Sequence, residues 1–349
     1  MSTEYNYFMN IALKEAVKGL GFTFPNPMVG AVIVKDGNVL STGYHSKLGS
    51  DHAERDAINK LSKNQLAGAT LFVTLEPCNH HGRTPPCTDA IIEAGINKVV
   101  IAAVDPDKRV MGSGINKLKN NKIEVVTGVL EKEAVELNSI FFHYKKTGKP
   151  YIIMKTAMSL DGRIASSQSV SKWISCDKSR EFVHKIRRTV SAIAVGHNTV
   201  IKDNPQLNCR IAGFESKPIK KIIFTNQNND YFSKFNISNN PGEIFTVNSK
   251  LLNNKEEFYE FCIKNEICSI LIEGGSGVYT EFIKSGLVDR LFVFYKTGFF
   301  GADALPAVRN LSIDNPSMIE SFAINKIENV DGDIMLDLYK GEPLCLQGL

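Results

Sequence analysis

Residues 75–87, LEPCNHHGRTPPC, contain two cysteines nine positions apart, Cys78 and Cys87. The three prolines of this segment cannot continue a helix or donate to a sheet, so a shaped loop is expected. Thiolates are good zinc ligands, and a catalytic zinc usually has three protein ligands and one open position for water. His52, in GSDHAERDAI, is the candidate for the third ligand. The sequence therefore predicts a zinc site formed by His52, Cys78 and Cys87.

Glu54 follows His52 by two residues. A His-x-Glu followed by Pro-Cys and a second cysteine is the signature of zinc-dependent base deaminases, in which the glutamate is not a ligand. Such a glutamate takes a proton from the zinc-activated water and gives it to the leaving ammonia. The loop between the cysteines is longer here than the usual Pro-Cys-x-x-Cys. We therefore expect hydrolytic deamination of a base, with Glu54 as the proton shuttle.

The alternative is a structural zinc site or a pair of buried free thiols. A structural zinc normally has four protein ligands, and His80 or His81 could provide the fourth. Glu54 beside His52 favours the catalytic interpretation, because a structural site has no use for a neighbouring carboxylate.

A second group of residues with chemical potential lies in the other half of the chain. Lys155 stands inside an apolar segment, where a lysine is costly unless it is paired or functional, so we expect it to face a substrate. The alternative is a lone lysine at the edge of a sheet. Asp203 falls where an apolar strand has ended, the place where ligands of α/β domains collect. It is our candidate for steering proton delivery during a hydride transfer.

Residues 270–283, ILIEGGSGVYTEFI, have the pattern of a strand, a glycine turn and a helix. Backbone amides at such a helix start suit the pyrophosphate of a dinucleotide. Gly275 and Gly277 are present, but Thr280 stands at the third glycine position of the standard dinucleotide fingerprint. The segment therefore does not indicate a standard Rossmann domain.

The elements that must position these residues alternate between helix and strand in the first half. Short apolar runs predict strands at 28–34, 69–75 and 98–104. Helical spacing predicts helices at 5–19, 52–62, 88–95 and 131–147. This order predicts a mostly parallel sheet with helices on its faces.

The segment 145–150, KKTGKP, is the best candidate for a linker, because Gly148 can end a helix and Pro150 follows it. A second α/β series begins at Tyr151. We expect strands at 151–157, 191–196, 219–225, 243–247, 268–273 and 290–296, helices at 177–189, 256–265 and 277–286, and a final hairpin over 321–340. The chain is thus interpreted as two α/β domains.

Composition limits the class of protein. The 349 residues carry a formal net charge of +4, and the lysines are spread rather than clustered, which gives no argument for nucleic-acid binding. Apolar runs are too short to span a membrane, and the first residues lack the features of a signal peptide. Seven scattered cysteines do not suggest a disulfide framework. We expect a cytoplasmic protein.

The first half contains PNPMVGAVIV, HAE and EPCNHHGRTPPCTDAI, which resemble the deaminase half of the bifunctional riboflavin-biosynthesis deaminase–reductases. The second half contains MKTAMSLDGRIA, SKWIS, VGHNTVIKDNPQLNCR and LIEGGSGVYTEFI, which resemble the reductase half. The resemblance implies an α/β fold in two parts. These are a cytidine-deaminase-like three-layer α/β/α domain with one zinc ion, residues 1–148, and a dihydrofolate-reductase-like α/β domain, residues 149–349.

The same resemblance implies the activity and the cofactors. The deaminase would act on 2,5-diamino-6-ribosylamino-4(3H)-pyrimidinone 5′-phosphate. The reductase would then use NADPH to convert the ribosyl side chain to ribityl and give 5-amino-6-(5-phosphoribitylamino)uracil. The expected partners are this phosphorylated pyrimidine and further copies of the chain, as a dimer or tetramer, but neither nucleic acid nor a membrane.

Individual roles are also implied by the resemblance. The expected catalytic residues of the reduction are Lys155 and Asp203. The expected substrate contacts are Asn26, Arg83, Ser171, Arg187, Leu207, Arg210 and Glu273. The expected cofactor contacts are Ala157, Trp173, Thr199, Asp203, Gly274, Gly275, Ser276 and Gly277. No role is assigned to His45, His80 and His81, while His143 and His184 are expected to be ordinary surface residues on helices.

Three other classes of protein fit the sequence less well. A nucleic-acid deaminase would share the zinc motif, but it would not need a second α/β domain of about 200 residues with a glycine turn. A zinc protein without activity would not need Glu54, Lys155 and Asp203. An enzyme with one decayed half would show a broken motif, and none is visible in either half.

Overall fold

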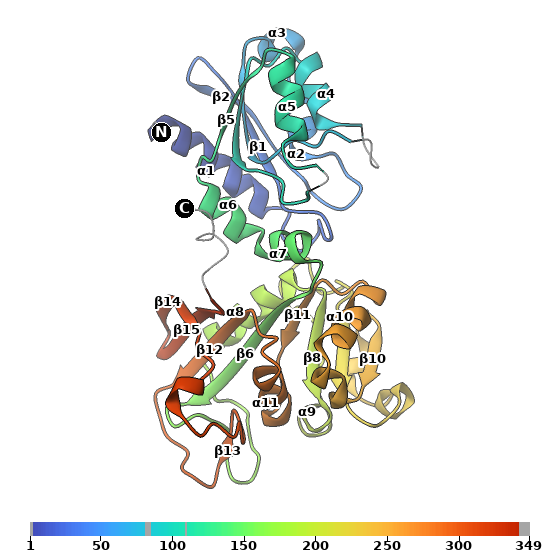
Figure 1. Cartoon of the computed structure of the whole chain (residues 1–349), viewed down its shortest axis with the longest axis vertical. Coiled ribbons are helices and arrows are strands. Elements are labelled where there is room, and N and C mark those ends of the chain that lie inside the picture. The colour runs from blue at the N-terminus through green and yellow to red at the C-terminus, as the bar shows by residue number, and fades with distance from the viewer. Residues whose placement is uncertain (1–2, 81–84, 109, 342–349) are drawn as a thin grey trace. The chain divides into compact units, whose positions relative to one another are not determined.

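The computed structural model describes residues 3–80, 85–108 and 110–341. The chain divides at the Gly148–Lys149 bond into two compact units (Figure 1). Each unit is built around its own β-sheet with helices packed against it. Among the described residues, no helix combines the length and the apolar character that crossing a membrane requires.

The sheet of the first unit has five strands in the order β2-β1-β3-β4-β5. They are β1 (Gly30–Lys35), β2 (Asn38–Tyr44), β3 (Thr70–Leu75), β4 (Lys98–Ala103) and β5 (Glu124–Thr127). Strands β3, β4 and β5 are parallel, but β1 runs antiparallel to both β2 and β3. Only β1 therefore runs against the other four strands, so the sheet is mixed, with most of its strands in one direction as expected. Strand β1 is reversed relative to β2 because the hairpin at Asp36 and Gly37, both with positive φ, returns the chain at once to pair beside it.

Helices cover both faces of this sheet, which makes the three-layer arrangement expected from the resemblance. The helices are α1 (Thr3–Val17), α2 (Ala53–Ile58), α3 (Lys63–Leu66), α4 (Cys87–Glu93), α5 (Ser113–Asn120), α6 (Glu131–Leu137) and α7 (Ser139–Thr147). One apolar cluster joins the sheet to α2, α4 and α5, and another joins its opposite face to α1, α6 and α7.

The single helix expected over residues 131–147 is wrong, because it breaks at Asn138 between α6 and α7. The buried Asn138 side chain accepts a hydrogen bond from the Met28 amide and donates one to the Met28 carbonyl, both at 2.8 Å. A side chain that satisfies a distant backbone in this way competes with local helix geometry. The break ties the end of the first unit to the segment that leads into β1.

The sheet of the second unit has eight strands in the order β10-β9-β8-β11-β6-β12-β15-β14. They are β6 (Tyr151–Ser159), β8 (Ala192–Gly196), β9 (Lys220–Phe224), β10 (Ile244–Val247), β11 (Ser269–Ile272), β12 (Arg290–Lys296), β14 (Ala323–Val330) and β15 (Asp333–Tyr339). The strands from β10 to β12 are parallel, and β15 and β14 add an antiparallel hairpin at one edge. A small separate pair is formed by β7 (Arg163–Ala165) and β13 (Leu305–Pro306).

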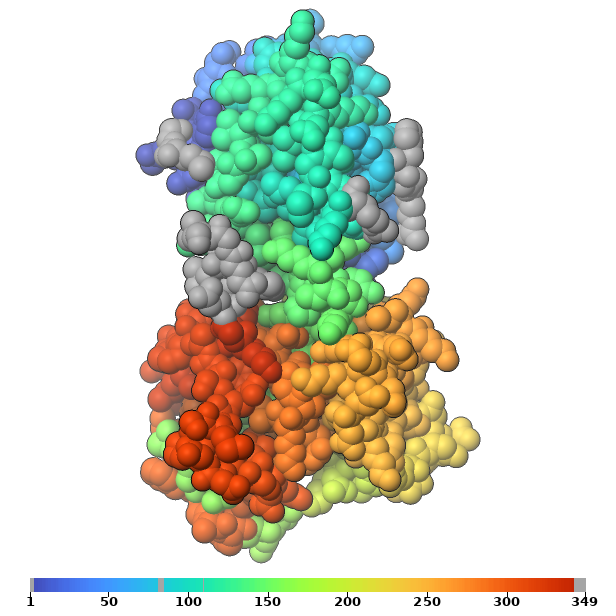
Figure 2. Space-filling view, viewed as in Figure 1, coloured from blue at the N-terminus to red at the C-terminus, as the bar shows by residue number. Residues whose placement is uncertain are grey.

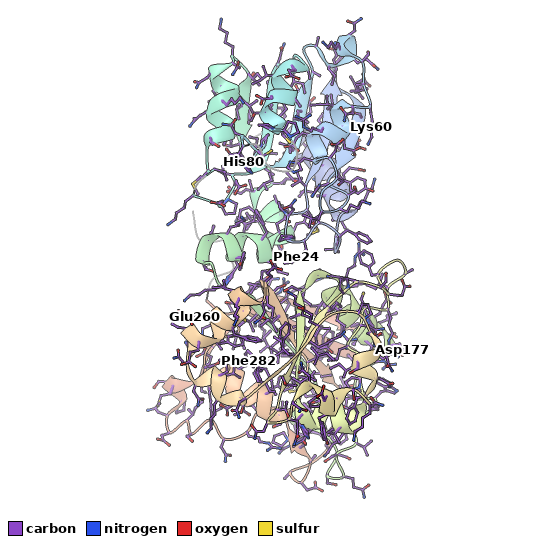
Figure 3. The ribbon with its side chains drawn as sticks, turned by 90° about the vertical axis from the view of Figure 1, so that its right-hand side faces the viewer. Phe24, Lys60, His80, Asp177, Glu260 and Phe282 are labelled. Atoms are coloured by element: carbon purple, nitrogen blue, oxygen red, sulfur yellow. The ribbon has the colours of Figure 1, made fainter. Side chains whose placement is uncertain are left out.

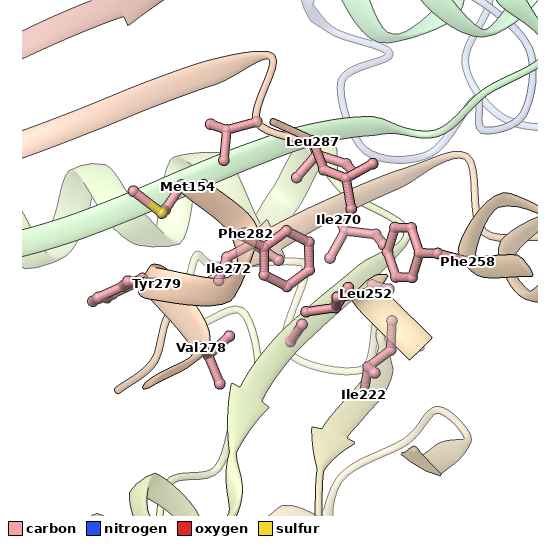
Figure 4. Packing of buried hydrophobic residues seen from close by; sticks show 14 of the residues in the cluster. Met154, Ile222, Leu252, Phe258, Ile270, Ile272, Val278, Tyr279, Phe282 and Leu287 are labelled. Carbon is pink, nitrogen blue, oxygen red and sulfur yellow. The ribbon is translucent and has the colours of Figure 1, made fainter. Parts of the chain in front are cut away.

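Within residues 149–341, four α-helices and four short 3-10 helices complete the second unit. They are α8 (Asp177–Thr189), α9 (His197–Asp203), α10 (Lys255–Lys264), α11 (Ser276–Lys284), η1 (Asn229–Phe232), η2 (Asn236–Asn239), η3 (Ser249–Asn253) and η4 (Pro316–Met318). The core lies where α10 and α11 pack on β6, β8 and β11 (Figure 4). There the fully buried rings of Phe258 and Phe282 meet edge to face (Figure 4).

Candidate active sites

The three expected metal ligands meet in the first unit. His52 lies immediately before α2, Cys87 is the first residue of α4, and Cys78 lies in the loop after β3. The Nδ1 atom of His52 is 3.5 Å from the Cys78 sulfur and 3.3 Å from the Cys87 sulfur. All three ligand atoms lie within 4.8 Å of one another, so one ion at about 2.0–2.3 Å from each could join them. One histidine and two thiolates are a donor set that suits zinc.

The electrostatics of this group favour a thiolate at Cys78. Its sulfur accepts one hydrogen bond from the Cys87 thiol and another, at 3.3 Å, from the Cys87 backbone amide. This amide is one of the first N–H groups of α4, which have no acceptor within the helix. These hydrogen bonds, with His52 beside them, lower the pKa of the Cys78 thiol to about 4. Zinc binding requires this deprotonated form.

Glu54 lies on the first turn of α2 with its side chain directed into the protein, and it is only 3% exposed. Burial, followed by the negative charge of Cys78, raises the pKa of Glu54 to about 7. A carboxyl group in such an environment can hold a proton at neutral pH and release it again. Within the described ranges, the metal-ligand group does not include His80, which is exposed (Figure 3).

His45 links Asn26 to this group, and the sequence assigned it no role. The His45 ring is buried and meets the His52 ring edge to face at 5.2 Å between centroids. Its Nε2 lies 3.2 Å from Asn26 Nδ2, and its Nδ1 lies 3.1 Å from the Asp51 carbonyl. Because the Asn26 amide nitrogen can only donate, Nε2 accepts and Nδ1 donates, which is a neutral imidazole. Asn26 is thus held near the metal ligands. Arg83 and His81 lie outside the described residues.

Glu76, two residues before Cys78, is a further buried residue of this region, and it was not among the predicted site residues. Its Oε2 accepts hydrogen bonds from the amides of Asp105 and Gly112, and its Oε1 accepts them from Gly114 and Ile115. Four backbone N–H groups thus donate to one carboxylate. Glu76 thereby holds the loop after β4 and the start of α5 against the loop that contains Cys78. The only hint in the sequence is a glutamate beside Pro77 at the end of an apolar strand.

The second unit contains a cavity of about 1290 Å³. It brings together nearly all the residues that the resemblance assigned to the reductase half. The lining includes Lys155, Ala157, Ser171, Trp173, Arg187, Thr199, Asp203, Leu207, Arg210, Glu273, Gly275, Ser276 and Gly277. Gly274 does not line it but lies behind, where an added Cβ would come 2.9 Å from the Thr199 hydroxyl oxygen. The turn before α11 therefore packs directly on α9.

Charged side chains are concentrated in the cavity wall. Arg187 and Glu273 form a two-pronged ion pair, and Arg187 also donates to the Asn208 carbonyl at 2.9 Å. Lys155 projects from β6, and burial lowers the pKa of its ammonium group although Glu273 partly offsets this. A cation with a lowered pKa next to an anion is typical of functional sites.

Asp203, at the end of α9, is tied to the segment that precedes α8. The Ser171 hydroxyl donates to its carboxylate at 3.2 Å, and the Lys172 ammonium donates to its carbonyl at 3.0 Å. Trp173 is 69% exposed, and its ring stacks on the Arg180 guanidinium at 4.5 Å. An exposed indole at the mouth of a cavity is available to cover a ligand.

At the start of α11, Gly275 has a φ of +76° and precedes the first helical residue, Ser276. Arg309 lies beside this turn, and its Nε donates to the Ser276 hydroxyl at 3.1 Å. Nothing in the local sequence around Arg309 marked it for a site. His184 was expected on the surface, but it is half-buried in the cavity wall, where its Nδ1 accepts a hydrogen bond from the Arg210 amide at 3.2 Å. That expectation was wrong because α8 turns this face inward.

Two family descriptions match the chain. Residues 2–103 match the cytidine and deoxycytidylate deaminase zinc-binding region, and residues 150–336 match the RibD C-terminal domain. Together with the geometry above, these matches define an enzyme that joins a zinc-dependent deaminase to an α/β reductase. The chain belongs to the RibD family of bifunctional riboflavin biosynthesis proteins.

Similarity to individual members extends over the whole chain. The riboflavin biosynthesis protein RibD of Aquifex aeolicus is 40% identical over 94% of this chain and 96% of its own length. The Escherichia coli RibD is 35% identical over 95% and 98%. A crystal structure of the Thermotoga maritima deaminase/reductase is 39% identical, with a TM-score of 0.86 over 97% of this chain and 99% of that one. The expected fold is thereby confirmed, and so are the expected cofactors, zinc and NADPH.

Proposed function

We propose that the chain catalyses two consecutive steps on one phosphorylated pyrimidine. The Thermotoga relative is a diaminohydroxyphosphoribosylaminopyrimidine deaminase and 5-amino-6-(5-phosphoribosylamino)uracil reductase. By analogy, the substrate is 2,5-diamino-6-ribosylamino-4(3H)-pyrimidinone 5′-phosphate. Residues 1–148 form the deaminase domain and residues 149–349 the NADPH-dependent reductase domain. The product of the second step is 5-amino-6-(5-phosphoribitylamino)uracil.

The deamination is assigned to the first unit. His52, Cys78 and Cys87 would hold one zinc ion, which supplies a hydroxide nucleophile at neutral pH when bound. Glu54 holds the proton taken from the attacking water and gives it to the departing amine, so that water is consumed and ammonia released. Asn26, oriented by His45, contacts the pyrimidine edge. The observation that carries this proposal is the buried Glu54 next to three ligand atoms that lie within 4.8 Å of one another.

The binding roles in this domain extend to the loop between the cysteines. Arg83 lies in that loop and is proposed to contact the substrate phosphate or a polar ring edge. A guanidinium is suited to either partner because its planar donors match phosphate and carbonyl oxygens.

The reduction is assigned to the cavity of the second unit, which is large enough for a cofactor and a substrate together. NADPH held in this cavity would supply the hydride, and Lys155 and Asp203, which line it, are proposed to act at the reacting end of the ribosyl chain. The proposed cofactor contacts are Ala157, Trp173, Thr199, Asp203, Gly274, Gly275, Ser276 and Gly277. The proposed substrate contacts are Ser171, Arg187, Leu207, Arg210 and Glu273. Arg187 acts mainly through Glu273, because the two side chains already bond each other.

The setting of the enzyme follows from the same analogy. We place it in the cytoplasm, acting on a small molecule without nucleic acid or membrane as a partner. We also propose that it works as a homo-oligomer.

The experiment that tests the two-site proposal compares the wild type with Glu54→Gln. Zinc content, ammonia release and NADPH oxidation on deaminated substrate are measured separately. Zinc near one per chain, loss of ammonia release and an unchanged reduction rate are expected for the variant. Glu93→Gln, an exposed glutamate on α4, is the matched control and should keep both activities. Normal deamination by Glu54→Gln would show that Glu54 is not the shuttle.

A further inference from the structure

Arg309 is an exposed cationic side chain in the wall of the reductase cavity, and the resemblance to the family assigned it no role. The chain between β13 and η4, which includes Arg309, belongs to the orange-red surface of the second unit (Figure 2). Arg309 also lines a second, smaller cavity of about 660 Å³, and Ser169 and Leu305 are shared by the two cavities in the same way. The Arg309 side chain therefore lies at the boundary between the two cavities.

Two hydrogen bonds fix Arg309 to the beginning of α11. Its backbone amide donates to the Thr280 hydroxyl at 2.9 Å, and its Nε donates to the Ser276 hydroxyl at 3.1 Å. Both hydroxyl groups belong to buried residues, and the Thr280 hydroxyl itself donates to the Ser276 carbonyl at 2.7 Å. Because the Nε hydrogen bond orients the guanidinium, its two Nη groups remain as the donors that a ligand can reach.

The guanidinium of Arg309 has no negative partner in the part of the chain that the structure describes. Its hydrogen bonds there are the two to α11, and it forms no ion pair. In the same cavity wall, by contrast, Arg187 pairs with Glu273, and Arg180 pairs with Asp177. A guanidinium that lines a cavity without a carboxylate beside it is available to an anionic ligand.

The start of α11 adds backbone donors beside this guanidinium. The amides of Ser276, Gly277 and Val278 open the helix, and no side chain caps them, so they have no acceptor within the helix. An added Cβ at Gly277 would meet no atom within 4 Å, so the space beside this residue is open. Glu281, the acidic residue of α11, lies beyond the first turn. Arg309 and the helix start therefore both favour negative charge at this part of the cavity.

We propose that Arg309 binds the pyrophosphate of NADPH through its Nη groups, beside the amides at the start of α11. This inference rests on the proposed NADPH-dependent reductase and adds a residue to its cofactor site. The hydrogen bond to Ser276, a proposed cofactor contact, places Arg309 on the cofactor side of the cavity. A pyrophosphate carries the negative charge that this group of donors lacks, and a guanidinium binds phosphate oxygens with paired hydrogen bonds.

The first test is the dissociation constant of NADPH from the full-length chain, measured by isothermal titration calorimetry. Arg309→Met should raise it by about tenfold or more, because hydrogen bonds to a charged group are lost. Arg309→Lys keeps the charge without the paired geometry and should raise it by a smaller factor. Lys284→Met is the matched control, since Lys284 is an exposed cation in the last turn of the same helix, and it should keep the wild-type value.

Fragments of the cofactor show which phosphate Arg309 binds. ADP-ribose contains the pyrophosphate without the 2′-phosphate, and 2′-AMP contains the 2′-phosphate without the pyrophosphate. Arg309→Met should weaken the binding of ADP-ribose by about the same factor as that of NADPH, and it should leave the binding of 2′-AMP unchanged. An equal loss of affinity for 2′-AMP, or a loss for 2′-AMP alone, would overturn the assignment to the pyrophosphate.

The outcomes separate this inference from the proposed function. A wild type that does not bind NADPH would overturn the proposed reductase, and with it the role of Arg309. If the wild type binds NADPH and Arg309→Met binds it equally well, the role of Arg309 alone is overturned. An equal loss of affinity in Lys284→Met would overturn it as well, because any positive charge on this helix would then have the same effect.

Thermal unfolding of each variant verifies that it folds. Arg309→Lys decides the matter if Arg309→Met does not fold. Wild-type affinity for both NADPH and ADP-ribose in Arg309→Lys would then overturn the proposed paired contact with the pyrophosphate.

Discussion

Arg187 and Glu273 face each other in the wall of the reductase cavity as a buried, two-pronged ion pair. The Nε–Oε1 distance is 2.5 Å and the Nη2–Oε2 distance is 2.8 Å. Burial alone would raise the pKa of Glu273, but the Arg187 guanidinium holds it below the usual value. The pair joins α8 to the end of β11, and Lys155 stands close enough to sense the Glu273 charge. The ion pair that links α8 to the end of β11 is therefore formed by the same two side chains that are proposed to contact the substrate.

Replacing one residue of this ion pair should lower the free energy of unfolding more than replacing both. Glu273→Leu leaves the Arg187 charge buried without its carboxylate, and it should cost about 3–5 kcal/mol of the free energy of unfolding. The double variant Arg187→Met, Glu273→Leu should recover part of that loss. Urea unfolding followed by the fluorescence of Trp173, the single tryptophan, measures both.

The exposed Lys185–Glu181 pair on the same helix supplies the control for this prediction. Replacing Glu181 by Leu should change the free energy of unfolding by less than about 1 kcal/mol, because exposed ion pairs contribute little. Equal costs for Glu181→Leu and Glu273→Leu would contradict the prediction.

Glu76→Gln should destabilise the packing of the loop after β4 against the segment that contains Cys78. A glutamine has one carbonyl oxygen, so two of the four backbone amides that Glu76 binds would lose their acceptor. Each hydrogen bond to a charged group is worth about 1.5–3 kcal/mol, and the expected loss of stability is of that order. The effect should appear as lower zinc affinity and a lower deamination rate with unchanged reduction. Glu93→Gln again serves as control, and an equal result for both variants would exclude this role.

Much of the fold and of the sites could be predicted because local signals were strong. Helix α8 begins and ends where its periodicity indicated, and the proposed ligands His52 and Cys87 lie at helix starts. In contrast, the strand β2 was missed, since NVLSTGY is mostly polar and only half-buried. The periodicity of apolar residues thus predicts a helix or strand well when one face of that element is buried.

The failures have a common physical cause, which is contact between residues far apart in sequence. Asn138 breaks a helix by bonding Met28, 110 residues away. Arg309 reaches the α11 turn from a loop 33 residues later. His45 bridges Asn26 and the metal ligands through bonds that only the folded chain creates. A single sequence contains no local pattern for such pairs.

Gly43→Ala should reduce deamination without affecting reduction. An added Cβ at Gly43 on β2 would lie 2.3 Å from the Ala53 carbonyl oxygen and 2.5 Å from the Ala57 amide nitrogen, both backbone atoms of α2. Helix α2 would have to move, and it carries Glu54. Overpacking of this kind costs about 1–3 kcal/mol, and we expect at least about a tenfold lower deamination rate because displaced catalytic groups lose alignment. Gly298→Ala, which meets no atom within 4 Å, is the control. Full deaminase activity in Gly43→Ala would contradict the close packing of β2 and α2.

His184 should make the stability of the reductase domain depend on acid pH. Burial, with the charges of Arg187 and Arg210, lowers the pKa of His184 from 6.5 to about 4. The neutral ring is also the form whose Nδ1 can accept the hydrogen bond from the Arg210 backbone amide. Between these two pKa values the unfolded chain binds more protons than the folded chain, so stability is full above pH 6.5 and is lost as the pH falls toward 4.

Replacement of His184 by glutamine removes this proton binding. The difference in the free energy of unfolding between pH 7 and pH 4 should shrink by about 1 kcal/mol, a value reduced for solvent screening because the ring is only half-buried. Urea unfolding at closely spaced pH values measures the change in slope. His80→Gln, at an exposed position in the other unit, should leave the slope between pH 6.5 and 4 unchanged. If His184→Gln keeps the wild-type slope, the acid sensitivity arises elsewhere and His184 does not carry it.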